Sequence, residues 1–140
     1  MAKVIVVGGG PGGYGAALFT AKHGLETLVF DTDETKMHKA YLYNYLGIEA
    51  IHGSEFMSIA RKQVKHFGAK ILNEKVTGIT PEGSRFKVET ERGQYSGDYL
   101  VLATGLSTEL LGGLGVKLQG KEVQVDRHGA TSAKNIYAVG

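Results

Sequence analysis

Three glycines and one acid are the residues whose types and spacing point most directly to chemistry. Gly8, Gly10 and Gly13 form a G-x-G-x-x-G, and Asp31 follows with seventeen residues, 14 to 30, between it and Gly13. In a dinucleotide-binding fold the first glycine permits a tight turn, the second admits a pyrophosphate, and the third lets helix and strand pack closely. An acid at this distance accepts hydrogen bonds from adenosine ribose and repels a 2′-phosphate. The pattern predicts a site for FAD or NAD; the alternative is a tight turn followed by a solvated acid.

The flanking segments have the composition needed to position this loop. Residues 3–7 are mostly β-branched and apolar on both faces, which predicts a buried parallel strand. Pro11 suits the first turn of a helix, and the sequence Lys22-His23-Gly24 suits its end. Residues 27–30 are a second apolar run that ends at Asp31. Strand, helix and strand together predict a βαβ unit around the glycines.

The rest of the chain predicts more strands and one more helix. Residues 31–53 show no clear period, so we expect a long loop with a short helical turn. Ser54 is the predicted N-cap of an amphipathic helix that ends at Gly68. Its apolar face is predicted to contain Phe56, Ile59, Ala60, Gln63, Val64 and Phe67. Further strands are predicted at 70–72, 76–80, 85–90, 94–98, 99–103 and 135–139, with turns at 81–83 and 92–93.

These elements predict an α/β fold in one domain spanning residues 1–140. The strands at 76–98 are expected to form an antiparallel β-meander, and the others a Rossmann-like parallel sheet that includes the βαβ dinucleotide-binding unit. The pair Gly113 and Gly115 imitates a second glycine motif, but Leu118 stands where a third glycine is needed, so we assign this segment to a loop.

Composition excludes several classes of function. The chain has 16 basic and 14 acidic residues without a dense basic cluster, so we expect no nucleic-acid partner. The apolar run 4–7 is too short for a signal peptide or a membrane span, and we expect a cytoplasmic protein. The chain contains no cysteine and its five histidines form no ligand cluster, so we expect no metal site. His38 lies in the long loop and is expected to be solvated; the alternative is a histidine that tunes or protonates a bound flavin.

Several motifs together resemble the thioredoxin-reductase group of flavoproteins. The segment 8–14, GGGPGGY, is similar to the FAD-binding glycine loop of that family, and 44–47, NYLG, is similar to its N-Y-P-G loop with Leu46 in place of proline. Residues 53–69 resemble the helix that follows, and 103–105, ATG, match a segment that follows a meander. Residues 131–132 and 136–140 resemble the stretch that leads into a G-D motif. The resemblance covers nearly the whole chain and favours FAD over NAD.

The resemblance also implies roles for individual residues. Asn44 is expected near the flavin, Val76 is expected to meet the adenine through its backbone, and Ala103 to Gly105 are expected on the pyrophosphate side. The FAD-binding residues expected in total are Gly8, Gly10, Pro11, Gly12, Gly13, Asp31, Asn44, Val76, Ala103, Thr104, Gly105 and Gly140. For Asn44 an ordinary turn residue is the alternative, and Val76 also suits a core position.

The sequence departs from the family pattern in two ways. About thirty residues separate Gly105 from the last strand, too few for the NADPH domain with its CxxC that the family inserts there. The chain also stops at Gly140, before the residues that approach the flavin ring. We therefore expect an FAD-binding oxidoreductase without thiol–disulfide activity, whose electron donor and acceptor are unidentified, with NAD(P)H as one candidate. The alternative is a non-catalytic FAD- or NAD-binding module or fragment. Either the natural protein is longer than this chain, or the flavin half of the site is open or completed by another chain, for example in a homodimer.

Overall fold

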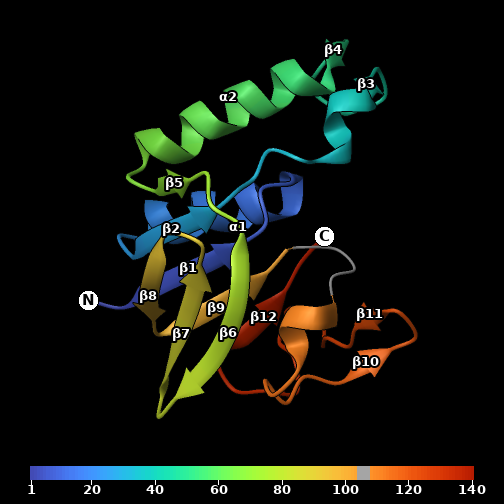
Figure 1. Ribbon diagram of the computed structural model, residues 1–140. Helices are drawn as coiled ribbons and strands as arrows, with labels where there is room; N and C mark the ends of the chain where they lie inside the picture. Colours follow the sequence, from blue (N-terminus) through green and yellow to red (C-terminus); the bar gives the residue numbers. More distant parts are fainter. Residues whose placement is uncertain (104–107) are drawn as a thin grey trace.

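A five-stranded parallel sheet forms the centre of the molecule. The computed structural model describes residues 1–103 and 108–140 (Figure 1). The strand order is β12-β9-β1-β2-β5, and every neighbouring pair is parallel. The strands are β1 (Lys3–Val7), β2 (Glu26–Phe30), β5 (Lys70–Leu72), β9 (Tyr99–Leu102) and β12 (Ile136–Ala138). Because side chains on both faces of β1, β2 and β9 are buried, most of their residues are apolar; the exceptions are Lys3 and Glu26 at the strand starts and the buried Thr27.

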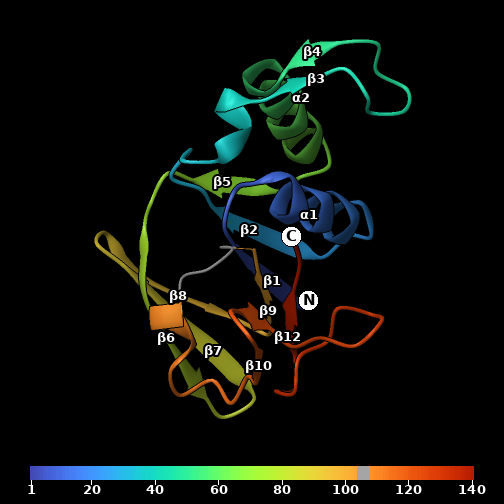
Figure 2. The ribbon, with the colours of Figure 1, turned by 90° about the vertical axis from the view of Figure 1, so that its right-hand side faces the viewer.

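Two helices cover one face of this sheet. Helix α1 (Pro11–Lys22) begins with its proline in the first turn, and the chain leaves it through Gly24, whose φ is +83°. Helix α2 (Gly53–His66) packs beside α1 (Figures 1 and 2). Tyr14 and Ala17 of α1 and Met57 of α2 share a buried cluster with Val6 and Val29 of the sheet. The predicted βαβ unit is confirmed.

An antiparallel meander covers the opposite face (Figure 2). It consists of β6 (Val76–Glu82), β7 (Arg85–Thr90) and β8 (Gly93–Gly97), paired in that order. Ile79 and Val88 pack against Ile5 and Leu100 of the parallel sheet. The three-layer α/β arrangement with its meander agrees with the sequence prediction. Pro81, predicted to lie in a turn, instead lies within the edge strand β6, where a missing N–H is tolerated.

Residues 31–53 contain more structure than the expected loop. A short 3₁₀ helix, η1 (Lys36–Lys39), is followed by the hairpin of β3 (Tyr41–Leu42) and β4 (Ile51–His52). Each hairpin strand has two residues, which is too short for a period to show in the sequence. The tip of the hairpin carries the exposed side chains of Tyr43, Tyr45 and Leu46.

Between β9 and β12 the chain forms η2 (Thr108–Leu111) and the hairpin of β10 (Leu118–Gln119) and β11 (Glu122–Val123). Residues 112–115 are turns, which confirms their assignment to a loop. Leu114 is buried in the cluster beneath the meander and anchors this segment. None of the helices in the two described ranges is long and apolar enough to cross a bilayer.

The buried face of α2 agrees with the predicted one only in part. Val64 is buried as predicted, and Phe56 and Ala60 pack partly buried against the same cluster. Ile59, Gln63 and Phe67 are exposed instead, and Met57, which was not predicted, is fully buried. Met57 belongs to the cluster shared by α1, α2 and the sheet, so the buried face of α2 is rotated toward Met57 relative to the predicted face. Ser54 is also not the N-cap, since the helix begins at Gly53 with His52 in the cap position.

Candidate functional site

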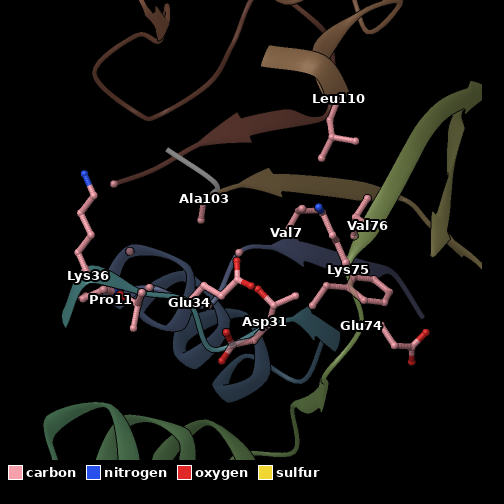
Figure 3. A pocket seen from close by; sticks show the side chains of 18 of the residues that line it. Val7, Pro11, Asp31, Glu34, Lys36, Glu74, Lys75, Val76, Ala103 and Leu110 are labelled. Atoms are coloured by element: carbon pink, nitrogen blue, oxygen red, sulfur yellow. The ribbon is translucent and has the colours of Figure 1, made fainter. Parts of the chain in front are cut away.

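A cavity of about 840 Å³ opens at the carboxyl ends of the parallel strands (Figure 3). In open α/β sheets this edge is where ligands bind. Hydrogen bonds from Gly8 N to Phe30 O (3.0 Å) and from Ala103 N to Val7 O (2.8 Å) fix the ends of three strands side by side. The residues lining the cavity are Val7, Gly8, Gly9, Gly10, Pro11, Gly12, Phe30, Asp31, Thr32, Glu34, Thr35, Lys36, Glu74, Lys75, Val76, Thr77, Ala103, Leu110 and Gly140.

The three motif glycines occupy different environments. Gly8 has a φ of +114°, which L side chains rarely adopt, and turns the chain from β1 toward α1. A side chain at Gly13 would collide with the carbonyl oxygen of Gly8 and lie 3.2 Å from the Cβ of Ala103. At Gly10 the nearest atom to an added Cβ would be Thr35 Oγ1, at 3.7 Å. Gly8 and Gly13 are therefore required by the fold of the loop, whereas Gly10 borders open space.

The N-terminus of α1 faces this cavity through Pro11 and Gly12. Its N-cap is Gly10, no side chain caps it, and its first turn contains no acidic residue. Free backbone N–H groups and the helix dipole make such an end favourable for an anion. Gly140 lies against Gly12, so that a side chain at Gly12 would come within 3.1 Å of the Gly140 Cα. The end of the described chain thus lines the cavity beside the start of α1.

Asp31 is a buried acid at the end of β2, with only 6% of the residue exposed. Its Oδ1 accepts a hydrogen bond from Asp33 N at 2.7 Å, and its Oδ2 accepts one from the Tyr14 hydroxyl at 2.5 Å. The carboxyl group lies directly against Gly9, where any side chain would collide with it. The acid is therefore not the solvated strand-end residue of the alternative interpretation.

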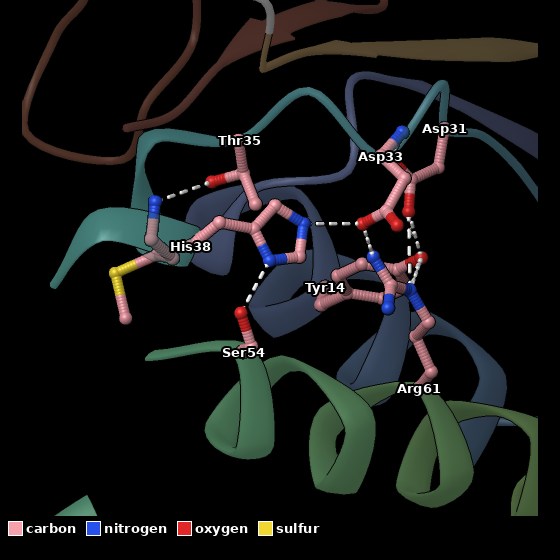
Figure 4. Close-up of polar contacts among 8 residues, drawn as sticks. Tyr14, Asp31, Asp33, Thr35, His38, Ser54 and Arg61 are labelled. Atoms are coloured by element: carbon pink, nitrogen blue, oxygen red, sulfur yellow. Dashed lines mark hydrogen bonds and ion pairs between the residues drawn. The ribbon is translucent and has the colours of Figure 1, made fainter. Parts of the chain in front are cut away.

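Arg61 of α2 completes the surroundings of Asp31, and the sequence analysis did not identify it. Its Nε lies 3.4 Å from Asp31 Oδ2 and 3.3 Å from the Tyr14 hydroxyl oxygen, and its guanidinium lies over the Tyr14 ring, 5.9 Å from the centroid (Figure 4). The helical pattern places Arg61 on the polar face of α2, and no local signal shows that this face turns toward Asp31. The only indication in the sequence was the residue type: Arg61 has a long cationic side chain and lies on a helix predicted to follow the βαβ unit.

A chain of polar contacts extends from Arg61 to the loop after β2 (Figure 4). Arg61 Nη2 also donates to Asp33 Oδ1, which contacts His38 Nε2 at 2.8 Å. The other ring nitrogen of His38 lies 2.7 Å from Ser54 Oγ on α2. His38 is exposed, as expected, and its ring also bridges the loop to the helix through these two contacts.

Two pKa values in this network are displaced. Burial raises the pKa of Tyr14, and its hydrogen bond to Asp31 raises it further, so the phenol remains a donor at neutral pH. Burial acts to raise the pKa of Asp33, but hydrogen bonds from His38 and Arg61 outweigh that effect and hold it below its usual value. Asp33 therefore stays ionised and paired with Arg61 at neutral pH.

The start of β6 forms the other long wall of the cavity. The Glu74 carboxylate accepts hydrogen bonds from the hydroxyls of Tyr95 (2.8 Å) and Thr90 (2.7 Å). The hydrogen bond to Glu74 raises the pKa of Tyr95. Lys75 extends into the cavity beside Val76, and Lys36 stands at the opposite end beside Pro11 (Figure 3). A cation therefore stands at each end of the cavity, with the Asp31 carboxylate between them.

The structure brings most of the predicted site residues to one place. Those that line the cavity are Gly8, Gly10, Pro11, Gly12, Asp31, Val76, Ala103 and Gly140. Gly13 lies beneath the loop and supports it. Asn44 is exposed at the tip of the β3–β4 hairpin and is not among the lining residues, and Thr104 and Gly105 lie outside the described residues. Within the two described ranges, no three or more His, Cys, Asp or Glu side chains are grouped so that they could hold a metal ion.

Comparisons with known proteins agree with this arrangement. A thioredoxin reductase of Spironucleus barkhanus is 32% identical over 119 residues, which cover 81% of this chain and 39% of that protein. The crystal structure of the atypical thioredoxin reductase TRi from Desulfovibrio vulgaris Hildenborough is 33% identical and superposes with a TM-score of 0.70, over 76% of this chain and 37% of that one. The chain thus spans less than two fifths of the length of these two proteins.

A third similarity concerns the fold alone. The ferredoxin-flavin thioredoxin reductase of Clostridium acetobutylicum has a TM-score of 0.89 over 99% of this chain and 88% of that one, at 15% identity.

The model of the pyridine nucleotide-disulphide oxidoreductase family matches residues 2–109 and 50–140. Together the two matched ranges include all but the first residue. The chain therefore belongs to the pyridine nucleotide-disulphide oxidoreductase family.

Proposed function

We propose that this chain binds FAD in the cavity at the sheet edge and is the flavin-binding part of an oxidoreductase related to thioredoxin reductase. The observation that carries the proposal is the meeting of the uncapped N-terminus of α1, the open space at Gly10 and the buried acid Asp31 at one cavity. The first two favour a pyrophosphate, and the third favours a ribose hydroxyl. Family membership supports a flavin as the redox group.

The residues present fit the adenosine and pyrophosphate end of such a cofactor. Gly10 and Gly12 would hold the pyrophosphate against the start of α1, Asp31 would accept from the ribose, and Val76 would meet the adenine. Ala103 and Gly140 also line the cavity, and the resemblance implies that Ala103, Thr104 and Gly105 lie on the pyrophosphate side. A bound flavin would supply the electron transfer, while these groups bind and orient it. Contact of Asn44 with the flavin stays a prediction.

The partners of the reaction form the second part of the proposal. The 140 residues contain no cysteine, and thiol–disulfide exchange requires a thiolate, so we do not assign that chemistry to them. We propose that electrons reach and leave the flavin by way of other groups or molecules, with NAD(P)H as the first donor to test. Reduction would appear as NAD(P)H-dependent bleaching of the yellow cofactor, and a binding module without turnover would not bleach.

Cofactor identity is the first test. Protein purified with saturating flavin is expected to retain FAD and not FMN, because Asp31 and the glycine loop recognise groups that FMN lacks. Heat release followed by chromatography identifies the retained flavin. Equal retention of FMN would contradict the assignment, and tight NAD binding without flavin affinity would favour the nucleotide-binding module instead.

Replacing Asp31 with asparagine is expected to weaken FAD binding and to lower the free energy of unfolding. Whichever way the new amide turns, its NH₂ group faces a donor: Tyr14 and Arg61 on one side or the Asp33 N–H on the other. The expected loss in each quantity is about 1 to 3 kcal/mol, the cost of a buried charged hydrogen bond left unmade. Calorimetric titration and urea unfolding measure the two effects. Unchanged FAD affinity in a folded variant would show that the acid does not serve the ribose.

A further inference from the structure

The carboxylate of Asp31 is held from behind by residues outside the glycine motif. Tyr14 donates to Oδ2 from α1, and Arg61 approaches the same oxygen from α2, thirty positions away in the sequence. Asp33 N holds the other oxygen, Oδ1. With both oxygens bonded, the carboxylate cannot rotate about its last side-chain bond without breaking these contacts.

Counting acceptor positions shows what remains available to a ligand. An ionised carboxylate offers about four positions, two on each oxygen. Tyr14 and Arg61 occupy those on Oδ2, and Asp33 N occupies one on Oδ1. The remaining position lies on Oδ1, and Asp31 lines the cavity. The held carboxylate is therefore suited to accept a single ribose hydroxyl.

The side chain of Arg61, which approaches Asp31 from behind, is itself fixed in place. The guanidinium of Arg61 also bonds Asp33 and lies over the Tyr14 ring, and only 23% of the Arg61 side chain is exposed. The start of α2 packs closely against the loop after β2: the carbonyl oxygen of Met37 lies so near Gly53 that a side chain at Gly53 would collide with it. Arg61 therefore presents one geometry to Asp31 before any ligand arrives, which lowers the cost of ordering the site on binding.

We propose that Arg61 and Tyr14 are positioning residues for ribose recognition: they orient Asp31 so that its Oδ1 accepts a hydroxyl of the adenosine ribose. This inference rests on the proposed function, because it assumes that an adenosine end binds at Asp31. It adds a residue of α2 to a site that the βαβ motif alone does not define. Arg61 acts through Asp31 and need not touch the ligand.

The test uses two probes that differ only at the ribose, ADP and 2′,3′-dideoxy-ADP, titrated calorimetrically into the whole chain. The wild type is expected to prefer ADP. Arg61→Gln is expected to weaken ADP binding about tenfold, the equivalent of one charge-assisted hydrogen bond. It should leave the affinity for dideoxy-ADP within about twofold, which a general structural or electrostatic defect would not do. Arg61→Lys, which keeps the charge, should recover part of the preference.

Two further variants keep the test decisive. Tyr14→Phe removes only the hydroxyl donor and should reduce the preference for ADP in the same sense. Lys62→Gln removes a charge from the exposed neighbouring position of α2 and should change neither affinity. Equal weakening of both probes by Arg61→Gln, or no weakening, would overturn the positioning role while leaving the proposed site intact. A wild type that does not distinguish the probes would instead overturn ribose recognition at Asp31, and this inference with it.

Discussion

Replacing Gly13 with alanine is expected to lower the free energy of unfolding by about 2 kcal/mol or more, as overpacking outweighs the helical gain of about 1 kcal/mol from alanine. The new methyl group would collide with the carbonyl oxygen of Gly8, a backbone atom that can move only if β1 or α1 moves. It would also press on Ala103 at the end of β9. The change therefore strains the junction of helix and sheet.

Gly15, two positions further along the same helix, provides the matched control. An added Cβ there meets nothing within 4 Å, and the residue is exposed. Gly15→Ala should raise the free energy of unfolding by about 0.5 to 1 kcal/mol, the difference in helix propensity. Urea unfolding followed by far-ultraviolet circular dichroism measures both variants. Changes of the same sign at the two positions would contradict the packing role assigned to Gly13.

Replacing Gly10 with valine should have the opposite profile, with FAD affinity lost and stability retained. The backbone at Gly10 is extended, with φ −80° and ψ −178°, which valine adopts readily, and a Cβ there comes no closer than 3.7 Å to Thr35 Oγ1. In the proposed complex the branched side chain would occupy the space of the pyrophosphate. We expect FAD binding to weaken about 100-fold, the equivalent of a steric cost near 3 kcal/mol.

Gly10→Ala provides an intermediate step, since a single methyl group fills less of the same space. Flavin fluorescence titration gives the affinities, and thermal unfolding without flavin gives the stabilities. If valine left FAD affinity unchanged, the pyrophosphate would not lie over Gly10. If it unfolded the protein, the open space beside this residue would not be free in solution.

Local sequence signals predicted the parts of the site that depend on the backbone. Apolar runs identified β1, β2 and β9, because strands buried on both faces leave few polar positions. The glycine spacing predicted the turn. Asp31 was identified because it directly follows the apolar run that forms β2, which ends at Phe30. These inferences need only a few consecutive residues and the geometry of a strand or a helix.

The polar contacts behind Asp31 could not be predicted in this way. Arg61 was placed on the polar face of α2, and its contact depends on how that helix is rotated against α1. The buried face of this helix includes Met57, which the helical pattern did not select. His38 was interpreted as a loop residue because the hairpin that shapes its surroundings has strands of only two residues. Side-chain contacts between distant segments depend on packing that a single sequence does not display.

The connection between β9 and β12 is a place where an extra domain could be inserted. Because the two strands are parallel, the connection leaves β9 after Leu102 and enters β12 at Ile136, so it lies outside the sheet and its length does not affect the pairing of the two strands. A guest domain whose own termini lie close together could be spliced into this connection without changing the order of the five strands. The turn at Gly120 and Lys121 offers an exposed splice point. The same sheet can thus serve a short chain or a modular protein several times its size.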